Sequence, residues 1–385
     1  MFGSIFIGLS GMNAFSTGLR QISNNIANIN TTGFKSSDLT FANLFGQGNG
    51  DGSSLGHGVE LASDRTDYTQ GELRQTDKDL DLAIDGNGFL VVLNGSERLF
   101  MRTGSFEVDP QGFIVLAGTE YRLAVMDETA ALSSLSIDSY RTNAPVATAT
   151  VKFADNLSST ATGHTLSDIT VYNADGGSDV WKVSFERSTS SPAGEWTVIV
   201  RDSASDEVGR QTLKFINGIV DQATAKLTFT DAAKNLSTVL DFSRNVTSFS
   251  SGSTSTLRKA ESDGYGLGAI TSMTVNEKGQ IELGYSNAQK KQLGSVAIAN
   301  FRDPQTLAAR DGGLYTHSGN LVEYLNSTHD SVGRVMSRRL EASNVDLSRE
   351  FGELIMVQRG FQASSQVVSA SNEMIQQLFG IRGQG

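Results

Sequence analysis

The sequence has no cysteine, a deficit of positive charge and no long apolar run, and each absence excludes a class of protein or site. Without cysteine in its 385 residues, the chain has no disulfide framework, no thiolate zinc site and no cysteine nucleophile. Its 31 Lys and Arg residues stand against 42 Asp and Glu residues, and the formal charge of -11 argues against a nucleic-acid partner. No run reaches the roughly 18 apolar residues of a membrane span, so we expect no membrane insertion.

The N-terminal stretch MFGSIFIGLSGMNAF is apolar but does not have the pattern of a secretory signal. It lacks a basic first region and an uninterrupted apolar core. We therefore expect it to belong to the mature protein. The length of the chain predicts two or more compact units.

Apolar residues recur with heptad spacing at both ends of the chain, which predicts terminal helices within residues 1–30 and 345–385. The N-terminal seam consists of Ile5, Met12, Phe15, Leu19, Ile22, Ile26 and Ile29. The C-terminal seam consists of Leu347, Phe351, Leu354, Phe361, Val368 and Ile375. We expect the two helices to form a coiled-coil-like pair.

The ordinary interpretation of such helices is a pair that packs in a core. A helix of about 25 residues, however, spans roughly 38 Å and is too long for one partner helix to bury it. The C-terminal seam also has polar gaps, which leave room for a third surface. We therefore predict that the seam residues mediate packing against further copies of the chain.

The first helix is followed by the asparagine-rich segment NNIANINTTGFK. Asparagine tolerates left-handed backbone and bonds locally to its own chain, and glycine commonly ends a helix. We predict a helix stop and hinge formed by Asn24, Asn25, Asn28, Asn30, Thr31, Thr32, Gly33, Phe34 and Lys35. Residues 31–70, with GQGNGDGSSLGHG at their centre, have too few apolar residues for a core and are expected to form an extended connector.

The middle of the chain has the alternation and turn signals of antiparallel strands. Two such blocks, 71–140 and 255–344, are expected to fold together as a discontinuous inner β domain. Residues 141–254 open and close in Ser/Thr-rich sequence and contain short alternating runs, which predict an inserted outer β sandwich or barrel. The predicted fold is therefore mixed and mainly β, with two terminal helices.

No arrangement of residues predicts catalysis, a cofactor or a metal site. Asp77, Asp79 and Asp81 resemble the start of a calcium loop, but Leu82 and Gly88 stand where that loop needs glycine and glutamate. We interpret these aspartates as the solvent-facing side of a strand. The four histidines are isolated from one another in the sequence.

Several segments resemble a known family. The segment ANINTTGFK (27–35) and the segment LEASNVDLSREFGELIMVQRGFQASSQVV (340–368) resemble the terminal signatures of the axial proteins of the bacterial flagellar rod and hook. The segments IDGNGFLVV (84–92) and RTGSFEVDPQGFIV (102–115) are similar to sequences shared broadly in this family. Residues 263–301 and the large insertion resemble the hook members.

This resemblance implies a non-enzymatic subunit that self-assembles into the flagellar hook, a curved flexible tube that transmits torque as a universal joint. It implies an extracellular location, reached without a cleavable signal peptide through the flagellar type III export apparatus. The implied partners are other copies of the chain, the distal rod protein, the hook cap protein and the hook-filament junction proteins. The alternatives are a distal rod protein of the same family and, more remotely, a secreted β-rich adhesin or enzyme.

Overall fold

The computed structural model describes residues 2–38, 40–45, 56–61, 65–126, 131–187, 194–319 and 322–382. The chain forms two compact units. The first unit comprises Met1–Asp138, Met273–Leu283 and Gln292–Gly385. The second unit comprises Ser139–Ser272 and Gly284–Lys291.

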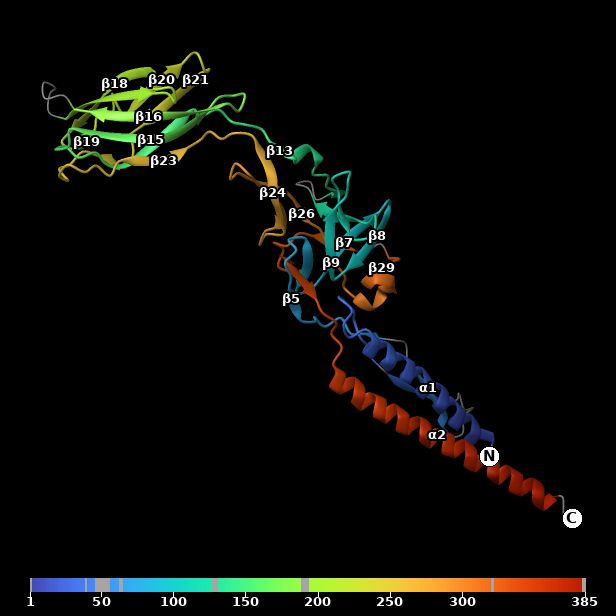
Figure 1. Cartoon of the computed structure of the whole chain (residues 1–385). Helices are drawn as coiled ribbons and strands as arrows, with labels where there is room; N and C mark the ends of the chain where they lie inside the picture. The colour runs from blue at the N-terminus through green and yellow to red at the C-terminus, as the bar shows by residue number, and fades with distance from the viewer. Residues whose placement is uncertain are drawn as a thin grey trace. The chain divides into compact units, whose positions relative to one another are not determined.

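Two long helices, α1 (Phe2–Ala27) and α2 (Leu347–Arg382), pack against each other in the first unit (Figure 1). The backbone N–H of Ser348 donates to Asp346 Oδ1 at 2.8 Å, so Asp346 caps the start of α2. After α1 the chain turns at Gly33, whose φ of 71° is the left-handed conformation that glycine adopts readily. No helix in the described ranges combines the length and the hydropathy that crossing a membrane would require.

The first unit contains most of the short strands. They are β1 (Ser37–Asp38), β2 (Phe41–Phe45), β3 (Gly56–Leu61), β4 (Arg65–Thr66), β5 (Leu73–Gln75), β6 (Asp81–Asp85), β7 (Phe89–Asn94), β8 (Glu97–Met101), β9 (Thr103–Val108), β10 (Ile114–Leu116), β11 (Arg122–Met126), β12 (Leu132–Ser134), β27 (Ile298–Asn300), β28 (Ala308–Arg310), β29 (Leu314–Thr316), β30 (Glu323–Leu325), β31 (Arg334–Ser337) and β32 (Arg339–Glu341). Residues of β24 (Gly268–Val275), β25 (Gln280–Tyr285) and β26 (Lys290–Val296) belong to both units. Three 3-10 turns are η1 (Asp138–Tyr140), η2 (Pro304–Thr306) and η3 (Asp311–Gly313).

Two separated stretches of sequence share one antiparallel sheet in the first unit. Val125 of β11 pairs with Val296 of β26, and Leu90 of β7 pairs with Ile298 of β27. These pairings confirm the predicted discontinuous antiparallel fold. Alternation along the strands directs one set of side chains into a common core, which includes Leu82, Ile84, Leu90, Val92, Leu123, Ile281, Val296 and Ile298.

The interpretation of the aspartates as a solvent-facing row is wrong for Asp81. This residue begins β6, which lies between β9 and β31 in the sheet, and its side chain is buried. The next three residues are buried as well, because both faces of this central strand are covered.

The stretch between α1 and β5, expected to be an extended connector, contains four short strands in two antiparallel pairs, β1 with β4 and β2 with β3. Strand β3 lies against α1, and a Cβ added to Gly58 would lie 2.1 Å from Ser10 Oγ. Glycine is therefore required at this contact. The glycine-rich centre of the predicted connector, residues 46–55, lies outside the described residues.

The described part of the second unit is mainly β, as its alternating sequence predicts. Its strands are β13 (Thr142–Asn143), β14 (Thr150–Asn156), β15 (Gly163–Tyr172), β16 (Ser178–Glu186), β17 (Glu195–Arg201), β18 (Glu207–Ile216), β19 (Ile219–Val220), β20 (Lys226–Asp231), β21 (Leu236–Asp241), β22 (Val246–Thr247) and β23 (Arg258–Ser262). Ten of these strands form one sheet around a single core. Trp181 and Trp196 are buried in that core.

Candidate functional site

The seam between α1 and α2 is close because small residues occupy the contact. A Cβ added to Gly8 would lie 2.6 Å from Val368 Cγ2, and one added to Gly360 would lie 2.5 Å from the ring of Phe15. Both distances are shorter than real Cβ contacts. Glycine at these positions therefore lets the two backbones approach.

The residues of the predicted seam differ in burial within the single chain. Ile22 is fully buried. Half-buried positions are Ile5, Met12, Phe15, Leu19, Ile26, Ile29, Leu354, Val368 and Ile375. Exposed positions are Leu347, Phe351 and Phe361. Helix α2 also buries Val357, which the sequence pattern did not single out.

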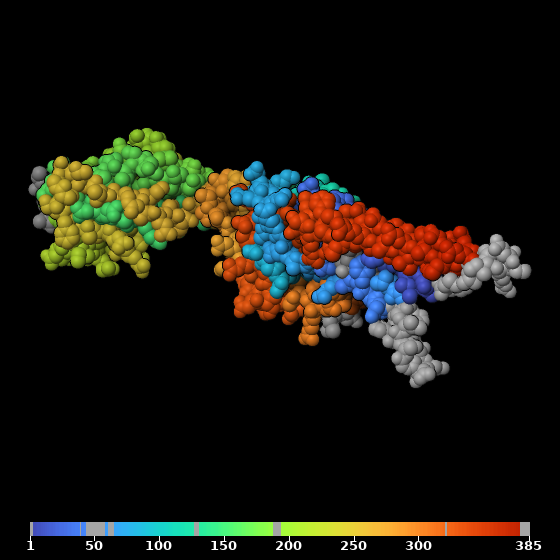
Figure 2. All heavy atoms as spheres, turned by 90° about the horizontal axis from the view of Figure 1, so that it is seen from below, coloured from blue at the N-terminus to red at the C-terminus, as the bar shows by residue number. Residues whose placement is uncertain are grey.

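Both helices expose large apolar side chains, and Phe6, at 75% exposed, and Met356, at 65%, are the extremes. The set comprises Phe6, Ile7, Leu9, Leu347, Phe351, Ile355, Met356, Phe361, Val367 and Met374. Figure 2 shows α2 in red alongside atoms of the N-terminal segment in blue. Exposed apolar side chains in such number on two adjacent helices commonly mark a contact with another molecule.

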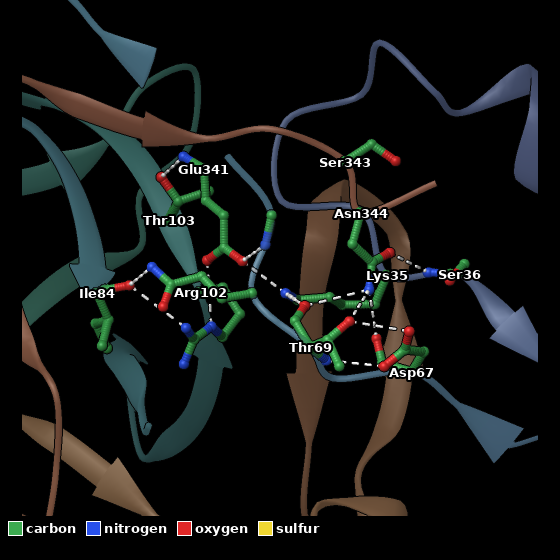
Figure 3. A network of polar contacts seen from close by, with 12 residues as sticks. Lys35, Ser36, Asp67, Thr69, Ile84, Arg102, Thr103, Glu341, Ser343 and Asn344 are labelled. Atoms are coloured by element: carbon green, nitrogen blue, oxygen red, sulfur yellow. Dashed lines mark hydrogen bonds and ion pairs between the residues drawn. The ribbon is translucent and has the colours of Figure 1, made fainter. Parts of the chain in front are cut away.

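A buried ion network connects the segment that follows α1 to the strand that precedes α2 (Figure 3). Glu341, at the end of β32, has a fully buried carboxylate that accepts from Lys35 Nζ at 2.6 Å and from Arg102 Nε at 3.2 Å. Lys35 Nζ also donates to the carbonyl of Thr69 at 2.6 Å. Burial lowers the pKa of Lys35, and the Glu341 carboxylate only partly offsets this effect.

The remaining donors of Arg102 are used by backbone carbonyls. Its guanidinium donates to the carbonyl of Gly86 at 2.7 Å and also to the carbonyl of Gly88. Glu341 Oε1 accepts a further bond, from the N–H of Gly71 at 2.9 Å. The side chains of Lys35, Arg102 and Glu341 each make more than one hydrogen bond. The network therefore holds the backbone segments around these three residues in place.

The segment around Lys35 is bonded through its backbone as well. The N–H of Gly33 donates to the carbonyl of Glu341 at 2.8 Å, and the N–H of Ser36 donates to Asn344 Oδ1 at 2.8 Å. A Cβ added to Gly33 would lie 2.9 Å from Thr103 Cγ2. This segment is therefore hydrogen-bonded to Glu341 of β32 and to Asn344, in the stretch that leads from β32 into α2.

Asn25 also makes long-range contacts from the asparagine-rich segment. Its Nδ2 donates to Glu350 Oε1 at 3.0 Å and to the carbonyl of Ser37 at 3.0 Å. Asn28 bonds only locally, accepting from Thr31 and donating to the carbonyl of Asn24. In this segment Asn24, Asn30, Thr31 and Thr32 are exposed, and Asn28 and Phe34 are half-buried.

The sequence analysis missed Arg102, Glu341 and Glu350 as partners of the N-terminal segment. Each stands alone in the sequence, and none belongs to a periodic pattern. Arg102, Glu341 and Glu350 do lie inside the quoted family-like segments, which was the available signal.

One acidic cluster of the second unit has the spacing of a cation site. Oxygens of Asp179, Asp202 and Asp231 lie within 4.8 Å of one another. However, Lys234 Nζ lies 2.9 Å from Asp179 and 2.7 Å from Asp202. These hydrogen bonds raise the pKa of Lys234, so its ammonium group already supplies the positive charge.

Both ends of the chain match models of flagellar families. Residues 5–35 match the family described as "Flagella basal body rod protein", and residues 336–381 match "Flagellar basal body rod FlgEFG protein C-terminal". These two ranges include Lys35 and Glu341.

Similarity to flagellar hook proteins extends along the whole chain. The chain is 31% identical over 410 residues to the flagellar hook protein FlgE of Brucella suis, covering 99% of both sequences. It is 30% identical over 408 residues to FlgE of Escherichia coli K12, covering 97% of this chain and 98% of that protein. The crystal structure of Helicobacter pylori FlgE2 has a similar fold, with a TM-score of 0.52 at 14% identity, over 70% of this chain and 100% of that one.

Proposed function

Because the chain belongs to the family of flagellar hook proteins, we propose that its copies assemble into the flagellar hook, a curved flexible tube that acts as a universal joint between basal body and filament. The observation that carries this proposal is similarity to hook proteins over nearly the full length. A distal rod protein is not favoured, since these full-length relatives are named hook proteins.

We propose that the two terminal helices form the cohesive inner contact of the tube. Head-to-tail contacts that do not close into a ring generate helical polymers. The exposed apolar side chains of the helices, such as Phe6, Phe351 and Met356, are costly to leave in water. Burial against neighbouring copies would remove this cost, and the half-buried seam residues would complete the contact.

We further propose that residues 24–35 and the connector after them form the joint that yields as the tube bends. A rotating bent tube requires each subunit to lengthen and shorten its axial spacing once per turn, which takes a compliant segment between rigid parts. The bonds of Asn28 and Thr31 are local, whereas Gly33 and Lys35 are anchored to Glu341. Part of the compliance would therefore lie between the end of α1 and Gly33, and the rest in the connector after Lys35.

By family membership we also propose the cellular setting. The chain would leave the cell through the flagellar type III export apparatus and would contact the distal rod protein, the hook cap protein and the hook-filament junction proteins. Its role would be structural and extracellular, without enzymatic activity.

Immunogold electron microscopy of isolated hook-basal bodies tests this function. An antibody against residues 139–272, which form the larger part of the second unit, should label the curved hook along its length. Label confined to the straight rod would favour the distal rod protein. Intact hooks without label would contradict both assignments.

A further inference from the structure

The carboxyl group of Glu350, in the first turn of α2, is buried with only one of its oxygens bonded. The residue is 5% exposed, and Oε1 accepts from Asn25 Nδ2 at 3.0 Å. Oε2 is shielded from solvent, and no donor in the described part of the chain reaches it. A buried oxygen without a donor is unfavourable, and more so on an ionised carboxylate than on a neutral acid.

The charged groups around Glu350 do not compensate for its ionisation. On α2 itself these are Arg349 and Glu353, on β1 there is Asp38, and α1 presents the uncharged amide of Asn25. Arg349 already bonds Asp38 Oδ1 at 2.7 Å and Glu353 Oε1 at 3.1 Å. Arg349 is therefore shared between two other carboxylates.

Burial is the main cause that raises the pKa of Glu350, and the carboxylates of Glu353 and Asp38 add to it. The hydrogen bond from Asn25 and the charge of Arg349 act in the opposite direction and are outweighed. Packing at the contact of α1 and α2 therefore shifts the equilibrium of this carboxyl group toward its neutral form, relative to a glutamate in water.

We propose that Glu350 is a proton-dependent latch between α1 and α2. The two helices dock at this point with the carboxyl group neutral, and the contact loosens when the group ionises. Asn25 is the positioning residue on α1, since its amide holds Oε1 and, through its bonds with Ser37, also holds the chain that follows. The latch rests on the packing of the single chain and does not depend on the proposed assembly.

The sign of the pH dependence follows from the raised pKa. The docked state holds its proton more tightly than the undocked state, whose carboxyl has the ordinary pKa of 4.5. The docking equilibrium constant should therefore fall by up to about tenfold for each pH unit between that value and the docked pKa. Below and above this window it should not change with pH.

Hydrogen exchange of the full chain tests the latch. Protection factors, corrected for intrinsic exchange, should be measured for the amides of residues 20–27 and 350–357 between about pH 4 and about pH 8. In the wild type they should fall as the pH rises. In Glu350→Gln they should stay independent of pH, whereas the control Glu373→Gln, at an exposed position further along α2, should keep the pH dependence.

A second measurement tests the latch if α1 and α2 do not dock in the Glu350→Gln variant. The carboxyl carbon of Glu350 in the wild type, followed by ¹³C NMR, should titrate above the ordinary value for glutamate. Titration at or below that value would overturn the latch. The latch would also be overturned if the wild-type protection factors did not change with pH or if these amides were unprotected at every pH. The same pH dependence of protection in Glu350→Gln would overturn it as well.

Discussion

Lys35 and Glu341, 306 residues apart in the sequence, form an ion pair with Nζ 2.6 Å from Oε1 and with both side chains almost completely shielded from solvent. Lys35 follows α1, and Glu341 precedes α2. The ion pair therefore joins the segment that follows α1 to the segment that precedes α2. Arg102 also bonds Glu341 and so links both segments to the sheet.

Loss of the shared carboxylate should destabilise the first unit strongly. Glu341→Gln would leave Lys35 and Arg102 buried with no opposite charge, which typically costs about 3–5 kcal/mol. Hydrogen exchange of amides in β6 and β9 against urea concentration would measure this loss. Trp181 and Trp196 lie in the second unit, so their fluorescence gives an internal control that should not change.

Glu72→Gln is the matched control for this substitution. Glu72 pairs with Arg74, and both side chains are exposed, so its loss should change the free energy of unfolding by less than about 1 kcal/mol. Equal effects of the two substitutions would show that the buried network does not stabilise the unit.

The same substitution at two glycines of α2 should have opposite effects. Gly360→Ala would place a methyl group against the ring of Phe15 and should weaken helix docking by roughly 1–3 kcal/mol. Gly352→Ala meets nothing within 4 Å and should stabilise the helix by roughly 0.5–1 kcal/mol. Circular dichroism during thermal unfolding would compare the two variants, and equal shifts would argue against a close seam.

Charges placed in the helical seam should block assembly without unfolding the β units. Leu354→Asp and Phe361→Asp would each put a carboxylate into an apolar contact, where its desolvation is costly. Sedimentation and negative-stain microscopy should find no tubes, while the fluorescence of the second unit stays native. Gln366→Asp, at an exposed polar position of α2, should still assemble. Normal tubes from Leu354→Asp and Phe361→Asp would refute the assignment of the seam.

Shortening the glycine-rich connector should change the mechanics of the hook and not the folding of its subunit. Deletion of residues 48–53 keeps four residues between Phe45 and Gly56, which pair across β2 and β3, so the contact of Gly58 with α1 and the ion network at Lys35 can still form. A shorter connector permits less movement, so we expect stiffer or straighter hooks in electron micrographs. Hooks of normal curvature, together with normal swimming, would contradict a role for this segment in bending.

Local spacing predicted the fold class well. The heptad spacing of Leu19 and Ile26 predicted the N-terminal helix, and that of Leu347 and Leu354 predicted the C-terminal helix. Strand alternation predicted the β units between them. These signals are readable because a helix and a strand repeat every 3.6 and 2 residues.

The ion network and the proton latch could not be predicted from local sequence. Lys35, Glu341 and Glu350 are single polar residues whose meaning depends on partners far away in the chain. Asp81 illustrates the same limit, since alternation suggested a solvent-facing side chain but residues on both faces of β6 are buried. Burial of this kind depends on what packs on the two faces of the sheet, which spacing alone does not contain.

The most direct test of the central claim is electron microscopy of basal bodies isolated from a host strain that lacks this gene. If the chain is the hook subunit, the strain should assemble complete rods that carry no hook, and expression of the gene should restore the hook. Truncated rods, or intact hooks with filaments, would contradict the account.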